Sequence, residues 1–366
     1  WYKLGTNFGI GAGDNETSIT ISGLDENFDA SLGLLMEVLT KPTSDAATLD
    51  ELKKIILVQR ADAKKQAESI SSALIQYNRY GNESSYLRMV PKDALLQLSA
   101  QQLYDTLRNL LTYKHTIAYT GSIPLEKVRA ALDTHFPVAQ SLQDPPPYKY
   151  MHARRPDANE IYFFDKEAAQ ASIRIEFGEP EYDAQREAAI QLFNEYFGGG
   201  MASIVFQELR EARGLAYSAG ARYVSGARVK DEDLMLGAIQ TQPDKAADAT
   251  TAFLDLMDKM PVSEDRFQLA KEAILNLYRT GKLGFREIIG AVRTWERKGL
   301  APDPRKERFQ LIENATMDTV LNFQKELIGG KPKLISIVGD KNRINMRELS
   351  TLGTIRDVPL TSIFID

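Results

Sequence analysis

The order of apolar and polar positions divides the chain into short strands and amphipathic helices. Residues 17–21 alternate as in a strand. Apolar residues then recur at helical spacing over 28–39 and 49–56, on either side of a break at Pro42. This pattern predicts a strand followed by two helices that are joined at a proline.

The same order returns in the second half of the chain. Residues 234–239 predict a strand, 246–260 a helix, and 269–277 a second helix beyond Pro261. Each unit then closes with an apolar strand, a glycine turn and a helix, over 117–132 in the first unit and 334–352 in the second. We therefore predict an α+β fold of two homologous domains, each a mainly antiparallel sheet packed with helices.

A proline-rich stretch separates the two units. Pro145-Pro146-Pro147 lies in a region of little periodicity, which is typical of an extended, semi-rigid connector. We place this connector at 141–157, so that the first domain is 1–140 and the second is 158–366.

The second domain has more chain before its matched strand than the first. We expect strands near 161–164 and 173–177, a helix over 184–197, and a glycine-rich helix that ends at Arg213. The first domain has no counterpart to these elements. The comparison predicts that a strand pair and a helix precede Trp1 in the intact protein, so the first domain would be N-terminally truncated.

Composition narrows the function mainly by exclusion. The net charge of -5 and the pI near 5.5 provide no basic surface for nucleic acid. No apolar run approaches the ~18 residues that a membrane span needs. The chain has no cysteine, which excludes disulfides, thiolate catalysis and Cys-ligated zinc. We expect neither a nucleic-acid partner nor a membrane span.

One stretch carries a chemical signature. Residues 209–218 read Leu-Arg-Glu-Ala-Arg-Gly-Leu-Ala-Tyr-Ser and follow the glycine run Gly198-Gly199-Gly200. They end an amphipathic helix and place the cation Arg210 seven residues before the phenol Tyr217. This spacing resembles the Arg/Tyr motif of the pitrilysin-type zinc peptidases, the family of insulin-degrading enzyme and the mitochondrial processing peptidase.

The resemblance implies roles for these residues. Arg210 and Tyr217 would be the catalytic pair that hydrogen-bonds the substrate carbonyl and stabilises the oxyanion formed when water attacks. Gly198, Gly199 and Gly200 would lie near the cleft and help to bind substrate. The alternative is structural, with Arg210 a solvated cation at a helix end, Tyr217 a half-buried strand residue and the glycines a joint between two helices.

The zinc motif of that family is missing. The family holds its metal with an inverted H-x-x-E-H on one helix, whereas this chain has only His115, His135 and His152, at unsuitable spacings. The position that we align with the third zinc ligand of catalytic halves is Gln59, a neutral donor that binds zinc more weakly than a carboxylate does. We therefore predict no metal site in this chain, and zinc in a missing N-terminal half or a partner subunit.

The resemblance implies that this chain is the C-terminal, zinc-free half of a metallopeptidase that encloses and hydrolyses peptides. It would supply chamber wall, substrate binding and the Arg/Tyr pair to an active site in the other half. The chain alone would be inactive. Its partners would be the N-terminal catalytic half and an unfolded peptide substrate, and relatives suggest the bacterial periplasm or cell envelope. The alternative is a non-catalytic assembly or scaffold protein with the same fold.

Overall fold

Contacts divide the chain into two compact units in the computed structural model, which describes residues 1–43, 46–136, 141–300 and 303–365. Unit 1 consists of Trp1–Gln59 with Val90–Lys149, and unit 2 of Arg60–Met89 with Tyr150–Asp366. The two domains that we expected are each continuous in sequence. The observed units are not, because residues 60–89 pack with unit 2. The reason is a helix in that segment that packs on the sheet of unit 2.

Unit 1 is built on a β-hairpin covered by helices. Its antiparallel strands are β1 (Asn7–Ala12) and β2 (Thr17–Ser22), and Phe8 lies opposite Ile21. Leu32, Leu35 and Leu39 of the first helix form its small core. The helices of this unit are α1 (Phe28–Thr40), most of α2 (Ala46–Ala63), α4 (Lys92–Gln97), α5 (Ala100–Leu110) and α6 (Leu125–His135).

The helices and the strand predicted within unit 1 form as expected, except for one further strand. Strand β2 and helices α1, α2 and α6 form where the apolar pattern placed them. The strand expected over 117–121 is wrong, because these residues have no ladder partner in the described part of the chain. An apolar run becomes a strand only when a neighbouring strand satisfies its backbone groups.

Unit 2 contains a six-stranded sheet in the order β5-β6-β4-β7-β3-β8. Strands β5, β6, β4 and β7 pair antiparallel, while β7, β3 and β8 pair parallel. The sheet is thus mainly antiparallel, and the predicted α+β class is confirmed. The strands are β3 (Glu160–Asp165), β4 (Ala171–Glu181), β5 (Ser218–Val224), β6 (Glu232–Thr241), β7 (Leu334–Gly339) and β8 (Thr354–Asp357).

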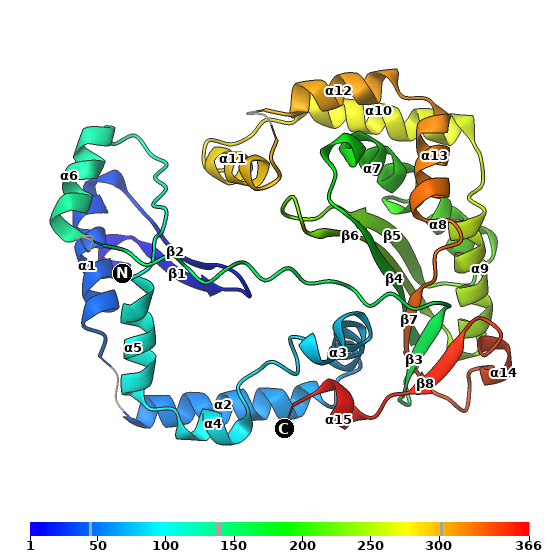
Figure 1. Ribbon diagram of the computed structural model, residues 1–366, viewed down its shortest axis with the longest axis horizontal. Helices are drawn as coiled ribbons and strands as arrows, with labels where there is room; N and C mark the ends of the chain where they lie inside the picture. The colour runs from blue at the N-terminus through cyan, green and yellow to red at the C-terminus, as the bar shows by residue number, and fades with distance from the viewer. Residues whose placement is uncertain (44–45, 137–140, 301–302, 366) are drawn as a thin grey trace. The chain divides into compact units, whose positions relative to one another are not determined.

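One face of this sheet carries the main core. Ile173, Ile175 and Phe177 point to this face from β4, and alternate with Ser172, Arg174 and Glu176 on the other. Packing against helices is close, since a Cβ added at Gly237 of β6 would lie 2.5 Å from Phe253 of α9. Figure 1 shows α9 and α13 on this side of the sheet.

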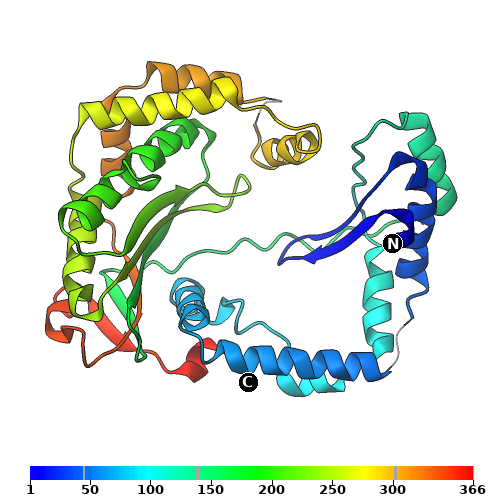
Figure 2. The same ribbon diagram turned by 180° about the vertical axis from the view of Figure 1, so that it is seen from behind.

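The helices of unit 2 flank the sheet, and α10 and α12 run side by side in both Figure 1 and Figure 2. The expected helix over 184–197 forms as η4 (Ala184–Arg186), α7 and a π-helical turn. The remaining helices are α3 (Ala67–Tyr80), α7 (Glu187–Phe193), α8 (Ile204–Phe206), α9 (Ala246–Asp258), α10 (Glu264–Thr280), α11 (Ile288–Arg297), α12 (Arg305–Asn314), α13 (Met317–Leu327), α14 (Met346–Leu349) and α15 (Leu360–Ile363). None of the described helices is long and apolar enough to cross a membrane.

Helix α3 covers only part of the opposite sheet face. Its Ile70, Ala73 and Leu74 form a second core with residues of β3 and β7. Asn78 of α3 donates to the carbonyl of Ile335, at 3.0 Å. The part of this face formed by β4, β6 and β5 extends beyond the helix.

A buried ion pair holds the end of α3 to the sheet. Arg79 donates from Nε to Oε2 of Glu176, at 3.0 Å, and from Nη2 to Oε1, at 2.5 Å. The two side chains are only 13% and 7% exposed. A bidentate pair of this kind fixes the orientation of the helix as well as its position.

Replacing Arg79 with methionine is expected to destabilise unit 2 by about 3–5 kcal/mol, because it leaves the Glu176 carboxylate buried without its partner. The double variant Arg79→Met/Glu176→Leu should recover much of this loss. Urea unfolding of the two variants and the parent chain tests this. Equal destabilisation by the single and double variants would contradict the assigned role of the pair.

Candidate functional site

Arg210 lies on a π-helical turn, η6 (Gln207–Ala212), that continues from α8. Leu209, fully buried, anchors this turn in the core. The Arg210 side chain is 46% exposed, its Nε lies 3.6 Å from Glu211 Oε1, and its guanidinium lies 4.9 Å from the centre of the Phe206 ring. The ion pair with the exposed Glu211 is long and weak, and nearly half of the side chain is in contact with solvent, so the guanidinium is accessible to a ligand.

Tyr217 lies immediately before β5, with 73% of its surface exposed. Its backbone N–H donates to the carbonyl of Gln240, at 2.7 Å, which attaches it to the neighbouring strand. Its hydroxyl has no hydrogen-bond partner among the residues that the structure describes. The half-buried strand residue of the structural alternative is therefore not what the structure shows.

The turn between the two side chains is firmly held. Gly214 has a φ of +56°, a conformation that favours glycine, and its N–H donates to the carbonyl of Arg210 at 3.2 Å. Thr241 and Lys245 hydrogen-bond the carbonyls of Leu215 and Gly214. Arg210 and Tyr217 thus project from one fixed turn, although no hydrogen bond joins them in the described part of the chain.

The glycine run lets a π-helical turn approach the sheet. Gly198 ends the turn η5 (Asn194–Gly198), and a Cβ added there would overlap the Ala221 carbonyl and lie 2.6 Å from its nitrogen. At Gly199 an added Cβ would lie 2.7 Å from the Asn194 carbonyl, whereas at Gly200 its nearest neighbour, Glu195 Oε1, would be 3.8 Å away. Gly198 and Gly199 therefore serve packing in this structure, and Gly200 has space around it.

The same turn satisfies the backbone at the edge of the sheet. Among the strands that the structure describes, β5 pairs only with β6, so one of its edges lies outside the ladder. The Asn194 amide donates to the carbonyl of Tyr223, at 2.8 Å, and its Oδ1 accepts from the Tyr223 N–H, at 2.7 Å. With Gly198 against Ala221, this arrangement occupies the edge at two successive outward-facing residues.

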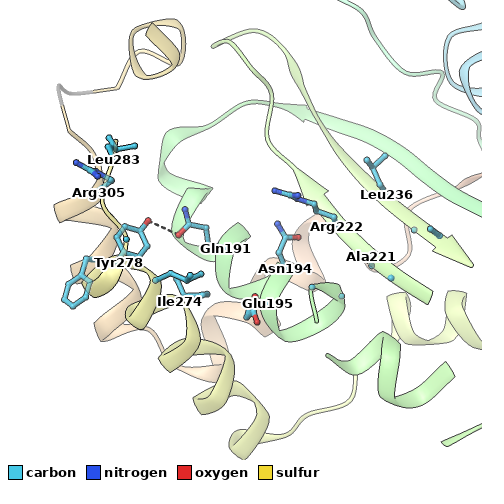
Figure 3. Close-up of a pocket in the computed structure, with 18 of the residues that line it drawn as sticks. Gln191, Asn194, Glu195, Ala221, Arg222, Leu236, Ile274, Tyr278, Leu283 and Arg305 are labelled. Carbon is cyan, nitrogen blue, oxygen red and sulfur yellow. Dashed lines mark hydrogen bonds between the residues drawn. The ribbon is translucent and has the colours of Figure 1, made fainter. Parts of the chain in front are cut away.

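A large cavity lies beside these elements. It has a volume of ≈ 1340 Å³ and is lined by η5, the open face of β4–β6–β5, α10 and the start of α12. Gly198 and Gly199 are part of its wall. Figure 3 shows Arg222 extending from β5 on the side where Asn194 and Gln191 lie, with Tyr278 hydrogen-bonded to Gln191 and Arg305 at the opposite wall.

The floor of this cavity holds an unusual cation. Arg174 is partly buried on β4, and burial lowers the pKa of its guanidinium below the ordinary value, an effect that Glu176 partly offsets. Its hydrogen bond goes to the carbonyl of Ile173, at 3.3 Å. The Glu176 oxygens already accept from Arg79. The sequence analysis did not identify Arg174. Its position between Ile173 and Ile175, two apolar residues of an alternating strand, could have indicated a cation on the polar face of the sheet.

The histidines are dispersed. His115 Nδ1 lies 2.7 Å from the Tyr113 carbonyl, His135 Nε2 lies 3.0 Å from Asp29 Oδ1, and His152 Nδ1 lies 3.2 Å from Glu232 Oε1. The described residues include no group of three or more His, Asp or Glu side chains that could hold a metal ion. Gln59 lies on the exposed side of α2.

The chain was compared with known protein families and with curated relatives. Residues 97–274 match the family model described as the peptidase M16 inactive domain. Over this stretch the chain is similar to the M16 inactive domain. This match confirms the predicted resemblance to the zinc-free half of the zinc peptidases. An uncharacterized zinc protease of Streptomyces coelicolor is 24% identical over 86% of this chain and 70% of its own length. One of Rickettsia felis is 23% identical over 60% of this chain, which spans about half (53%) of that relative.

Solved structures share the fold of this inactive-domain chain. A peptidase M16 inactive domain from Pseudomonas fluorescens superposes with a TM-score of 0.70 and 17% identity, covering 98% of this chain and 84% of the other. The ferredoxin protease FusC, solved with Arabidopsis ferredoxin, gives a TM-score of 0.73 at 14% identity. That match covers 93% of this chain and 37% of FusC. At these identities the likeness establishes the fold.

The packing role of the glycine run can be tested with a matched pair. Gly198→Ala is expected to destabilise the inactive domain by about 1–3 kcal/mol, because the added methyl group overlaps the backbone of β5. Gly200→Ala adds the same group where there is space. Denaturant unfolding compares them, and similar stabilities for the two variants would show that η5 does not seal the strand edge.

Proposed function

We propose that this chain is the zinc-free half of a metallopeptidase, and that it holds an extended peptide while the other half cleaves it. The observation that carries the proposal is the turn at Gly214, which presents an accessible guanidinium and a phenol without a hydrogen-bond partner from a fixed backbone. Side chains left free on a rigid support are suited to a ligand. The names of the relatives and the inactive-domain match support the same conclusion.

In this proposal the other half would hold zinc, which would activate the attacking water. Arg210 and Tyr217 each donate a hydrogen bond to the substrate carbonyl oxygen, and these bonds strengthen as negative charge grows on that oxygen. Because the turn that carries them is already fixed, little reorganisation is needed when the peptide arrives.

The peptide would be bound largely through backbone contacts, with restrictions on where they can form. Strand addition at β5 is limited, since Asn194 and Gly198 occupy its outer edge at Tyr223 and Ala221. Side chains on the open sheet face and at the Gly214 turn would then provide contacts near the cavity. The bacterial periplasm or envelope is the proposed compartment.

Hydrolysis of a quenched fluorescent peptide by the chain combined with its H-x-x-E-H half tests the proposal. Arg210→Ala and Tyr217→Phe are each expected to lower kcat/KM by about 10²-fold, the usual cost of losing one oxyanion donor. Arg213→Ala removes a neighbouring exposed cation and serves as the control. Unchanged hydrolysis in the first two variants would refute the assigned roles, and a partner half without the zinc motif would favour the scaffold alternative.

A further inference from the structure

The residues that line the cavity of unit 2 carry more unpaired positive than negative charge, and the Arg/Tyr pair does not account for this. Four cations that line it, Arg174, Arg222, Lys282 and Lys306, form no ion pair within the part of the chain that the structure describes. The acidic lining residues are Glu176, Glu195 and Asp303. Glu176 is neutralised by Arg79, and Asp303 by Arg305 at 2.7 Å, so among the described residues Glu195 is the one lining carboxylate without a partner.

Arg174 is the residue for which this imbalance matters most. A guanidinium that is partly removed from water and has no carboxylate of its own is destabilised relative to a solvated one. A carboxylate brought into the cavity would replace the lost hydration with charge-assisted hydrogen bonds. Arg174 therefore points to an anionic ligand more strongly than an exposed surface arginine would.

The sheet register places a second arginine on the same face. Arg222 of β5 lies opposite Leu236 of β6, and Arg174 of β4 lies opposite Ala238. Gly220 also pairs with Ala238, so small residues lie between the two arginines. Strand spacing puts their Cα atoms roughly 12 Å apart. Two long cationic side chains thus border a shallow floor of glycine and alanine.

The size of the cavity favours a peptide over a small metabolite. Its volume of ≈ 1340 Å³ exceeds the ≈ 300–1,000 Å³ usual for a small-molecule pocket. Leu236, Ile274 and Phe309 add apolar surface to the wall. The cavity can accept several residues of an extended chain, with the carboxylate near Arg174 and apolar side chains beside it.

We propose that Arg174 and Arg222 form a carboxylate-binding subsite that selects peptides with an acidic side chain or a free C-terminal carboxylate. The subsite rests on the proposed function in taking a peptide as its ligand. It is separate from the Arg/Tyr pair, since neither Arg210 nor Tyr217 lines the cavity. Its contribution is to affinity and to the choice of peptide.

Fluorescence anisotropy of labelled octapeptides added to the chain alone tests the subsite. An amidated peptide with three glutamates is compared with the same peptide carrying glutamines, and with the glutamine peptide ending in a free carboxylate. We expect at least one carboxylate peptide to bind about tenfold more tightly than the amidated glutamine peptide at low salt, with the preference reduced at high salt. The first comparison reports an acidic side chain, and the second a chain terminus. Equal binding of all three peptides would overturn the proposal.

Variants connect the preference to the two arginines. Arg174→Gln and Arg222→Gln should each weaken the preferred peptide about tenfold and leave the amidated glutamine peptide unchanged. Arg347→Gln removes an exposed cation from α14, outside the cavity, and should have no effect. If Arg347→Gln weakened binding as much as the other two, general charge attraction would be the cause and the subsite would be refuted.

Two controls separate stability and catalysis from selection. Arg222 is exposed, so Arg222→Gln tests the subsite without disturbing the core, and thermal unfolding checks that Arg174→Gln remains folded. The double variant Arg210→Ala/Tyr217→Phe should keep the carboxylate preference. A preference that persists while hydrolysis is insensitive to Arg210 and Tyr217 would remove the proposed function and leave the subsite standing.

Discussion

The edge of strand β5 imposes the constraint on which the arrangement of unit 2 depends. Its backbone groups need partners, and Asn194 supplies them at Tyr223 from a π-helical turn that reaches the strand because residue 198 has no side chain. This contact brings the end of α7 to the sheet and forms one wall of the cavity. It also limits strand addition at this edge, so that side chains beside it are better placed to contact a ligand.

On the opposite face of the sheet, one part packs against helix α3 and another part lines the cavity. Helix α3 covers β7, β3 and part of β4, where the Arg79–Glu176 pair fixes it, while the rest of β4 lines the cavity with β6 and β5. Arg79 donates to both oxygens of Glu176, whereas Arg174 hydrogen-bonds the Ile173 carbonyl and gains only a through-space attraction from that carboxylate.

Strong local patterns were sufficient to predict much of the fold. Hydrophobic periodicity identified α1, α9 and α10, which bury apolar side chains in a core, and it also located α2, although the apolar Leu52, Ile55 and Val58 of that helix are exposed. Alternation identified β2, and apolar runs identified β4 and β6. It failed at 117–121, where no partner strand is present among the described residues. Spacing located Arg210 and Tyr217, but could not show that Gly198 packs on a strand or that Glu176 is already paired. Those properties depend on contacts between residues distant in sequence.

The position of α3 in the chain has a consequence for synthesis. Asn78 hydrogen-bonds Ile335, 257 residues later, so the helix is made long before the strand that it covers. At translation rates of ~5–20 residues per second the apolar face of α3 waits on the order of tens of seconds for β7. During that interval it can associate with other chains, and a chaperone that shields this short segment would raise the yield of folded protein more than one acting on the later helices.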